Sequence, residues 1–134
     1  MVDASAWVLA LLGTNTAADA ARAAMIADPQ WAAPTHAALE TIRTIRRFQT
    51  VGTINAETEA LAVASVIDAT VEYCGAEPWL LRDAWALRHN LSIYDAPYVA
   101  IAIRFSAPLL TADQRLARAA HSAGATVQAL PKTV

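Results

Sequence analysis

Residues 94–113 decide the fold, and they read YDAPYVAIAIRFSAPLLTAD. The stretch from Tyr94 to Phe105 is almost entirely apolar, which is typical of a helix buried on most sides. Leu109 to Ala112 forms a short apolar run of the kind found in buried strands, and an aspartate follows it directly. A buried helix leading into a buried strand favours a sheet that is covered by helices.

The same alternation of helical patterns and short apolar runs extends over the rest of the chain. Strands are predicted at residues 1–3, 31–33, 70–73, 109–112 and 126–130. Helices are predicted at residues 4–12, 15–27, 34–51, 56–68, 78–89, 94–105 and 114–122. Strands separated by helices favour a parallel sheet, so we predict one three-layer α/β/α domain over residues 1–134 with a central parallel sheet.

The composition limits the classes of function. Apolar residues make up 56% of the 134 residues and charged residues only 16%, so we expect a buried sheet and a protein partner. No apolar stretch reaches the roughly 18 residues needed to cross a bilayer. The lone Cys74 and an apolar start without basic residues predict a cytoplasmic protein in a reducing compartment. The net charge of −2 argues against a broad cationic face for nucleic acid, but not against a local basic patch.

Four acidic residues stand where a parallel sheet collects functional groups. Asp3 and Asp113 directly follow predicted strands, and the carboxyl ends of such strands meet at one edge of the sheet. Asp95 begins the buried helix, with Tyr98 on the same side, and Glu40 lies one turn into its own helix. Each acid also has a plain structural interpretation: Asp95 and Asp113 as helix caps, Asp3 as a turn residue, and Glu40 as a surface partner of Arg43. These interpretations do not explain why four acids on four segments aim at one crevice.

The local strings around these acids resemble the motifs of PIN-domain proteins, in particular the VapC toxins of bacterial toxin–antitoxin pairs. The strings are VDASA at 2–6, YDAPYVAIA at 94–102 and LLTADQRLA at 109–117, with LETIRTIRR at 39–47 as the weakest. Two features depart from the family. Only Met1 and Val2 precede the first aspartate, which predicts a weak first strand, and Ile103 and Arg104 stand where an acid is frequent.

The resemblance implies an α/β/α PIN-like fold and a metal-dependent endoribonuclease. It implies that Mg²⁺ or Mn²⁺ is held by the acids, that structured RNA such as transfer or ribosomal RNA is cleaved, and that the protein forms a homodimer and binds a small VapB-like antitoxin. We assign Asp3, Asp95 and Asp113 to the metal, while Glu40 is either a further ligand or the residue that orients the attacking water.

Further side chains are predicted around the acids. Ser5 and Thr111 are candidates for orienting the metal ligands, with local backbone capping as an equal alternative. Cations must border an acidic pocket that binds RNA, and the candidates are Arg43, Arg46, Arg47 and Arg115, with a solvated helix face as the alternative.

Other chemistries find no support in the sequence. The three histidines lack the spacing of a zinc site, and the four glycines form no phosphate-binding loop. Two alternatives to a toxin remain: a related nuclease that acts in RNA processing, and a non-catalytic binding module of the same fold.

Overall fold

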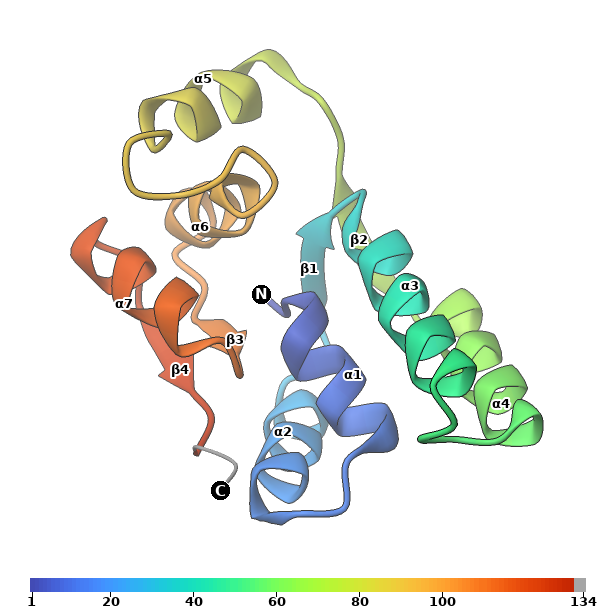
Figure 1. Cartoon of the computed structure of the whole chain (residues 1–134). Helices are drawn as coiled ribbons and strands as arrows, with labels where there is room; N and C mark the ends of the chain where they lie inside the picture. The colour runs from blue at the N-terminus through green and yellow to red at the C-terminus, as the bar shows by residue number, and fades with distance from the viewer. Residues whose placement is uncertain (132–134) are drawn as a thin grey trace.

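The computed structural model describes residues 1–131 as a chain of short helices and strands (Figure 1). The helices are α1 (Ala4–Leu12), α2 (Thr16–Ala27), α3 (Ala37–Thr50), α4 (Ala56–Asp68), α5 (Pro78–Ala86), α6 (Ala96–Arg104) and α7 (Gln114–Ser122). The strands are β1 (Trp31–Pro34), β2 (Val71–Cys74), β3 (Leu109–Thr111) and β4 (Val127–Ala129).

The strands form two parallel pairs that the N-terminal residues join. β1 pairs with β2 and β3 pairs with β4. Between the pairs, Val2 N–H donates to the Ala32 carbonyl at 3.2 Å, and Asp3 N–H donates to the Leu110 carbonyl at 3.2 Å. Residues 1–3 therefore act as a very short central strand, and the order across the sheet is β2, β1, residues 1–3, β3, β4 (Figure 1).

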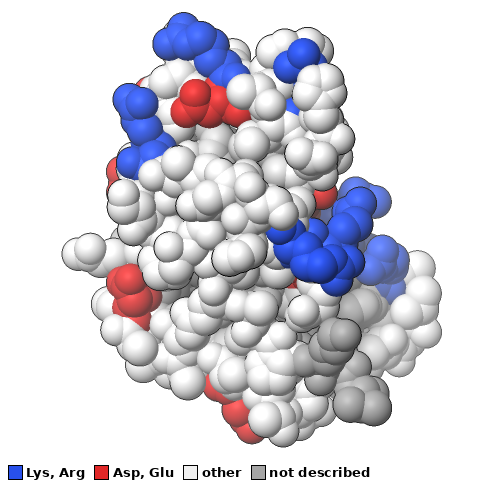
Figure 2. Space-filling model, turned by 90° about the vertical axis from the view of Figure 1, so that its left-hand side faces the viewer, with Lys and Arg blue, Asp and Glu red and all other residues white. Residues whose placement is uncertain are grey.

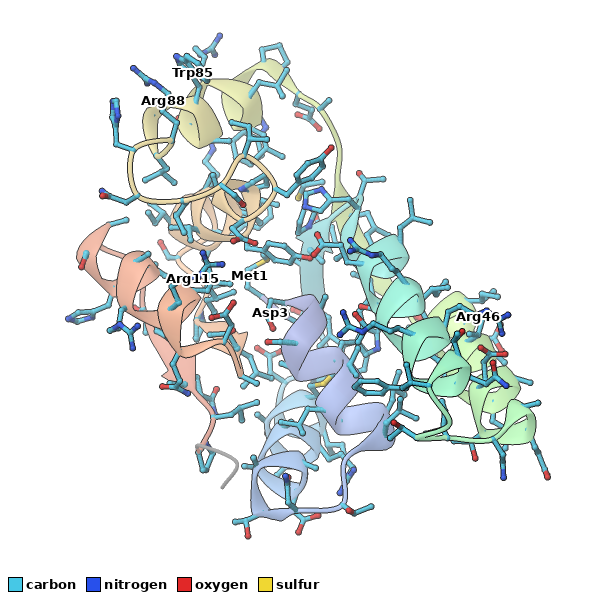
Figure 3. All side chains as sticks on the ribbon, in the orientation of Figure 1. Met1, Asp3, Arg46, Trp85, Arg88 and Arg115 are labelled. Atoms are coloured by element: carbon cyan, nitrogen blue, oxygen red, sulfur yellow. The ribbon has the colours of Figure 1, made fainter. Side chains whose placement is uncertain are left out.

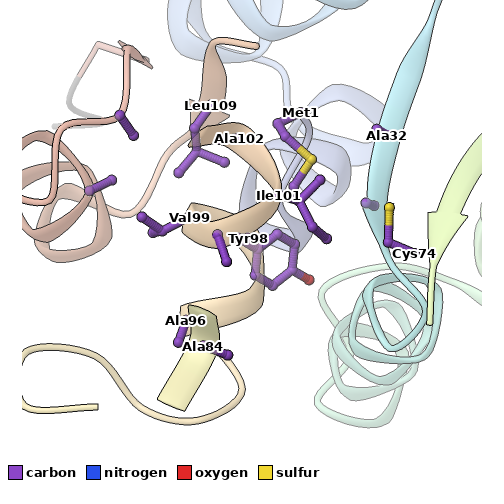
Figure 4. Packing of buried hydrophobic residues seen from close by; sticks show 14 of the residues in the cluster. Met1, Ala32, Cys74, Ala84, Ala96, Tyr98, Val99, Ile101, Ala102 and Leu109 are labelled. Atoms are coloured by element: carbon purple, nitrogen blue, oxygen red, sulfur yellow. The ribbon is translucent and has the colours of Figure 1, made fainter. Parts of the chain in front are cut away.

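Helices cover both faces of this sheet, and each face has its own apolar core. One core is built mainly from α5, α6 and α7, and the other mainly from α1, α2, α3 and α4. Met1 belongs to the first core and Val2 to the second, because neighbouring side chains of an extended segment point to opposite faces. Figure 4 shows the first core, with Tyr98 and Ile101 of α6 packed beside Met1.

This arrangement confirms the predicted fold class of helical layers around parallel strands. The nearly all-apolar helix is indeed buried: Ala96 and every residue from Tyr98 to Ala102 are at most 3% exposed. No helix within residues 1–131 has both the length and the apolar character required to cross a bilayer.

Several predicted boundaries were wrong. Pro34 does not open a helix but ends β1, opposite Cys74, and α3 starts at Ala37. The fixed backbone angle of proline fits the end of a strand as well as the first turn of a helix, so the proline alone does not decide between them.

Two further helix boundaries also differ from the prediction. α5 ends at Ala86, not at His89. α6 starts at Ala96, not at Tyr94, because a turn over residues 92–95 precedes it, with Asp95 N–H bonded to the Ser92 carbonyl at 3.1 Å.

Candidate metal centre

Asp3 lies buried where the central segment of the sheet passes into α1. Its carboxylate accepts hydrogen bonds from the Ala6 N–H at 2.8 Å, from Ser5 Oγ at 2.7 and 2.9 Å and from Thr111 Oγ1 at 2.5 Å. The side chain therefore caps α1 and is tied to the end of β3. Burial raises the pKa of Asp3 from 3.8 to about 6, and the charge of Asp113 adds to this effect, although the hydrogen bonds oppose it. A carboxylate kept in this position gains from a nearby cation.

Asp113 follows β3 and begins α7. Its Oδ1 accepts the N–H groups of Arg115 and Leu116 at 3.0 and 3.1 Å, so the capping interpretation describes its local contacts correctly. Thr111 Oγ1 accepts the Asp113 N–H at 3.0 Å, and the same hydroxyl donates to Asp3. Both capping bonds use Oδ1, so the cap does not require Oδ2. Thr111 thereby links the two acids that follow neighbouring strands.

Glu40 extends from the first turn of α3 toward α6. Its Oε1 lies 3.4 Å from the Tyr98 hydroxyl, which donates to it, and 3.2 Å from His36 Nε2. Partial burial raises the pKa of Glu40, and the charge of Asp95 acts in the same direction, whereas His36, Tyr98 and, least of all, Arg43 lower it. The alternative interpretation, a surface ion pair with Arg43, is not found within residues 1–131, and Glu40 contacts His36 instead.

Asp95 precedes α6 but does not cap it. The backbone of Asp95 is helical, and its side chain makes no capping hydrogen bond. Instead, Asp95 Oδ2 lies 3.5 Å from the Arg115 guanidinium of α7, and the carboxylate is 25% exposed. Asp95 thus faces the same side as the first turn of α7.

The hydroxyl of Tyr98 lies among these acids. Burial raises its pKa far above the ordinary value, and the charges of Glu40, Asp3 and Asp95 raise it further. Three acids from separate segments therefore act on one buried phenol. The sequence pattern placed Tyr98 on the same helical side as Asp95 but did not predict that its hydroxyl lies in the site. The spacing of three residues between Asp95 and Tyr98 could have indicated this position.

The acids are arranged as two pairs and not as a closed cage. The Thr111 hydroxyl contacts the side chain of Asp3 and the backbone of Asp113, and His36 contacts Glu40 and the carbonyl directly before Asp95. Within residues 1–131, no three Asp, Glu, His or Cys side chains stand close enough together to hold a metal ion by themselves. This arrangement fits Mg²⁺, which keeps several waters and is commonly bound by one or two carboxylates together with substrate phosphate.

The predicted basic residues differ in their surroundings. Arg115 is 76% exposed beside Asp95. Arg47 lines a hollow of about 680 Å³ together with Ser5 and Glu40, and Arg43 is exposed on the same helix. Arg46 points away from the acids and pairs with Glu59 of α4 at 3.1 Å. In Figure 3, Arg115 lies on the side of Met1 and Asp3, whereas Arg46 lies at the outer edge of α3.

The fold and the site can be compared with known proteins. The PIN domain family model matches residues 1–122. The chain belongs to the PIN-domain family. It is 36% identical to Ribonuclease VapC3 of Mycobacterium tuberculosis over 125 residues, which cover 93% of the chain and 90% of the relative. It is therefore homologous to the VapC ribonuclease toxins over most of its length, as the resemblance of its motifs predicted.

Other PIN-domain relatives match over different lengths. Ribonuclease VapC1 of M. tuberculosis is 55% identical over 42 residues, and this match covers only 31% of the chain and 32% of VapC1. Among solved structures, M. tuberculosis VapC20, described as a sarcin–ricin loop cleaving toxin, superposes with a TM-score of 0.67 at 20% identity, over 97% of the chain and 98% of VapC20. PAE2754 of Pyrobaculum aerophilum superposes with a TM-score of 0.63 at 20% identity, over 94% of the chain and 87% of that protein. These two structural similarities, both at 20% identity, show that the fold is shared.

Proposed function

We propose that this PIN-domain chain, as one domain over residues 1–134, is a metal-dependent endoribonuclease toxin that hydrolyses phosphodiester bonds in structured RNA, such as transfer or ribosomal RNA. The observation that carries the proposal is that Asp3 is tied to the residues around Asp113 through the Thr111 hydroxyl, while Glu40 contacts the Tyr98 hydroxyl on the helix that Asp95 precedes. The relatives VapC3 and VapC1 are both named ribonucleases, which supports the same activity here. The lone cysteine, Cys74, fits a protein that acts in the reducing cytoplasm.

We assign some side chains to binding the metal ion and others to orienting its ligands. Asp3, Asp95 and Asp113 are the proposed ligands of Mg²⁺ or Mn²⁺, and Glu40 either joins them or holds the attacking water. A bound divalent ion supplies a more acidic water and neutralises charge on the phosphate. Ser5 and Thr111 orient Asp3, since both hydroxyls donate to its carboxylate.

The RNA must approach an acidic pocket, and cations on two sides assist this approach. We propose that Arg43 and Arg47 of α3 contact phosphates on one side and that Arg115 of α7 does so on the other. Arg46 has a weaker claim because it is paired with Glu59. Figure 2 shows the face on the left of Figure 1, where basic atoms form separate groups and acidic groups lie among them, so this face has no broad cationic surface.

We also propose that a cognate VapB-like antitoxin inhibits the enzyme by placing a cationic side chain among the acids. Support comes from the charge balance of the site. Within the described residues 1–131, Asp95 is paired with Arg115 and Glu40 contacts His36, but no ion pair is formed by Asp3 or Asp113. An added cation would be stabilised by this excess of negative charge.

We also propose that the protein forms a homodimer. Five large apolar side chains are at least 50% exposed around one hollow of about 570 Å³: Leu39, Leu81, Trp85, Ile93 and Tyr94. An exposed apolar surface of this kind is typical of an interface. A second copy of the chain is the occupant that the family resemblance implies.

Expression of the wild type and of an Asp95→Asn variant, followed by mapping of new RNA 5′ ends, tests the nuclease. The wild type should generate discrete new ends that require Mg²⁺ or Mn²⁺ and should arrest growth. Asp95→Asn should reduce cleavage by more than about a hundredfold, since loss of an outer partner of a metal ligand already costs about 10- to 100-fold. Asp83→Asn, at an exposed acid of α5, is the matched control and should cleave normally.

The same experiment separates the alternatives. Equal cleavage by the wild type and Asp95→Asn, or cleavage that is unaffected by a chelator, would contradict the proposed site. Absence of cleavage by the wild type in the presence of Mn²⁺ would favour a binding module. Relief of growth arrest by a short upstream reading frame would favour a toxin over an RNA-processing nuclease.

A further inference from the structure

His36 joins two segments that carry acids of the proposed metal centre. It precedes α3, yet its side chain makes no capping hydrogen bond. Instead, His36 Nε2 lies 2.8 Å from the backbone carbonyl of Tyr94, the residue directly before Asp95. The same nitrogen lies 3.2 Å from Glu40 Oε1. One imidazole nitrogen therefore contacts both the Glu40 carboxylate and the chain that carries Asp95.

The ring of His36 is also held by aromatic contacts on two sides. It meets the ring of Tyr94 edge-to-face, with centroids 5.7 Å apart and an interplanar angle of 82°. It meets the ring of Tyr98 in the same way, at 5.6 Å and 87°. Such T-shaped pairs favour one orientation of a ring. Packing against the two tyrosines therefore sets the direction of Nε2 toward the Tyr94 carbonyl.

The chemical form of the ring follows from its partners. A carbonyl oxygen can only accept a hydrogen bond, and a charged carboxylate likewise only accepts. Nε2 therefore carries a hydrogen and donates it to the Tyr94 carbonyl, with Glu40 Oε1 3.2 Å away. A side chain without a donor at this position would leave the Tyr94 carbonyl without this partner and Glu40 without its nearest polar neighbour on this side.

Within residues 1–131, few other hydrogen bonds hold the segment before α6 in place against the start of α3. The backbone of Asp95 is bonded locally to Ser92, whose hydroxyl accepts the Asp95 N–H at 3.1 Å. Tyr94 is 68% exposed, so its side chain gains little from burial. The polar contact between α6 itself and Glu40 is the longer Tyr98 bond of 3.4 Å. Among residues 1–131, the His36–Tyr94 bond is thus the shorter of the two hydrogen bonds that join His36 and Glu40 to Tyr94 and Tyr98.

We infer that His36 is a positioning residue that holds Glu40 and Asp95 at the separation needed to bind the divalent ion. The inference rests on the proposed function, since it assigns His36 to the same centre. His36 acts through Glu40 and the Tyr94 backbone, not as a metal ligand. Loss of an outer partner of this kind typically weakens metal binding by about 10- to 100-fold.

Two substitutions at position 36 separate donation from packing. His36→Gln places an amide N–H close to the position of Nε2, so it keeps the donor. His36→Leu keeps an apolar side chain between the two tyrosines but has no donor. Mn²⁺ binding to the full-length protein, measured by electron paramagnetic resonance of free Mn²⁺, should weaken by at least about tenfold in His36→Leu and by no more than about threefold in His36→Gln. Cleavage by His36→Leu should lose kcat with little change in KM.

A control and a reference variant complete the experiment. His121→Leu, at an exposed histidine of α7, should bind Mn²⁺ like the wild type. Equal Mn²⁺ affinity in His36→Leu and the wild type, with weaker binding in Asp95→Asn, would overturn the role of His36 and leave the proposed function standing. Affinity lost equally in Leu and Gln variants would also overturn it, because the donor would then be irrelevant. Absence of Mn²⁺ binding and cleavage in the wild type would instead overturn the proposed function, and the inference with it.

Discussion

The two pairs of acids are held by different means. Asp3 and Asp113 follow neighbouring strands of the sheet, and one buried hydroxyl, Thr111, contacts the side chain of the first and the backbone of the second. Glu40 and Asp95 lie on α3 and before α6, and their carboxylates are 34% and 25% exposed. They are joined through His36 and Tyr98 across the gap between helices.

The difference shows how rigidity is distributed in this site. Hydrogen bonds between adjacent strands fix the sheet pair, and burial makes the charge of Asp3 costly. The helix pair is more accessible to water, so its charges cost less, but its geometry depends on a few side-chain contacts. A divalent ion that binds here would therefore relieve electrostatic cost at Asp3 and restrict movement at Glu40 and Asp95.

The largest effect concerns the charge of Asp3. Its pKa in the folded state is about 6 instead of 3.8, so the folded protein binds the proton more tightly than the unfolded chain. The free energy of unfolding of the metal-free protein should therefore fall as pH rises from about 4 to 6.5, by about 3 kcal/mol from this residue. Urea unfolding in the presence of EDTA measures this, and Mn²⁺ should recover part of the loss at pH 7.5.

Asp3→Asn serves as the comparison because it is close in shape and does not titrate. The free energy of unfolding of Asp3→Asn should not show the fall of about 3 kcal/mol between about pH 4 and 6.5. Asp95→Asn, in the more exposed pair, should still show this fall. The same pH dependence in Asp3→Asn and the wild type would show that Asp3 is not the group responsible.

A smaller effect is expected from the hydroxyl that organises the sheet pair. Thr111→Val removes the donor to Asp3 and the acceptor of the Asp113 N–H, and it should lower the free energy of unfolding by about 1–3 kcal/mol. Cleavage should fall by about tenfold or more. Thr111→Ser keeps the hydroxyl and should retain most of the activity.

Thr41→Val is the matched control for Thr111→Val. Thr41 is also fully buried, but its hydroxyl bonds to the Ala37 carbonyl within α3. It should change stability with little effect on cleavage. If Thr41→Val and Thr111→Val impaired cleavage equally, the hydroxyl of Thr111 would have no specific role.

The smallest effect concerns basic residues near and far from the acids. Arg115→Ala should lower kcat/KM severalfold and reduce the salt dependence of RNA binding by about one charge, because it removes one phosphate contact. Arg46→Ala should leave cleavage nearly unchanged and cost at most about 1 kcal/mol, as expected for an exposed pair with Glu59. Equal losses in the two variants would mean that RNA contacts α3 over a wider surface. Steady-state cleavage at several salt concentrations distinguishes these outcomes.

The acids that follow the strands could be predicted from the sequence, whereas the contacts between helices could not. The positions of Asp3 and Asp113 after strands were predictable, because the carboxyl ends of parallel strands meet at one edge of the sheet. The bond from Ser5 to Asp3 was accessible from their spacing of two residues. Thr111 stands two residues before Asp113, and its bond to Asp3 required the pairing of residues 1–3 with β3. The contact of His36 with Tyr94 was not accessible from the sequence, because the two residues are 58 positions apart and meet only when the segment before α3 approaches the segment before α6. The pairing of Arg46 with Glu59 was missed for the same reason, since it depends on the packing of α3 against α4.

The sequence by itself determined the alternation of helices and strands, the burial of α6 and the family to which the chain belongs. These properties follow from apolar periodicity and from local motifs, which act over a few residues. Only the tertiary structure decided that the Thr111 hydroxyl contacts Asp3, that Glu40 contacts His36 and the Tyr98 hydroxyl, and that Arg115 lies beside Asp95. Distances between side chains on separate helices depend on how those helices pack, and packing is set by the whole core and not by any local pattern.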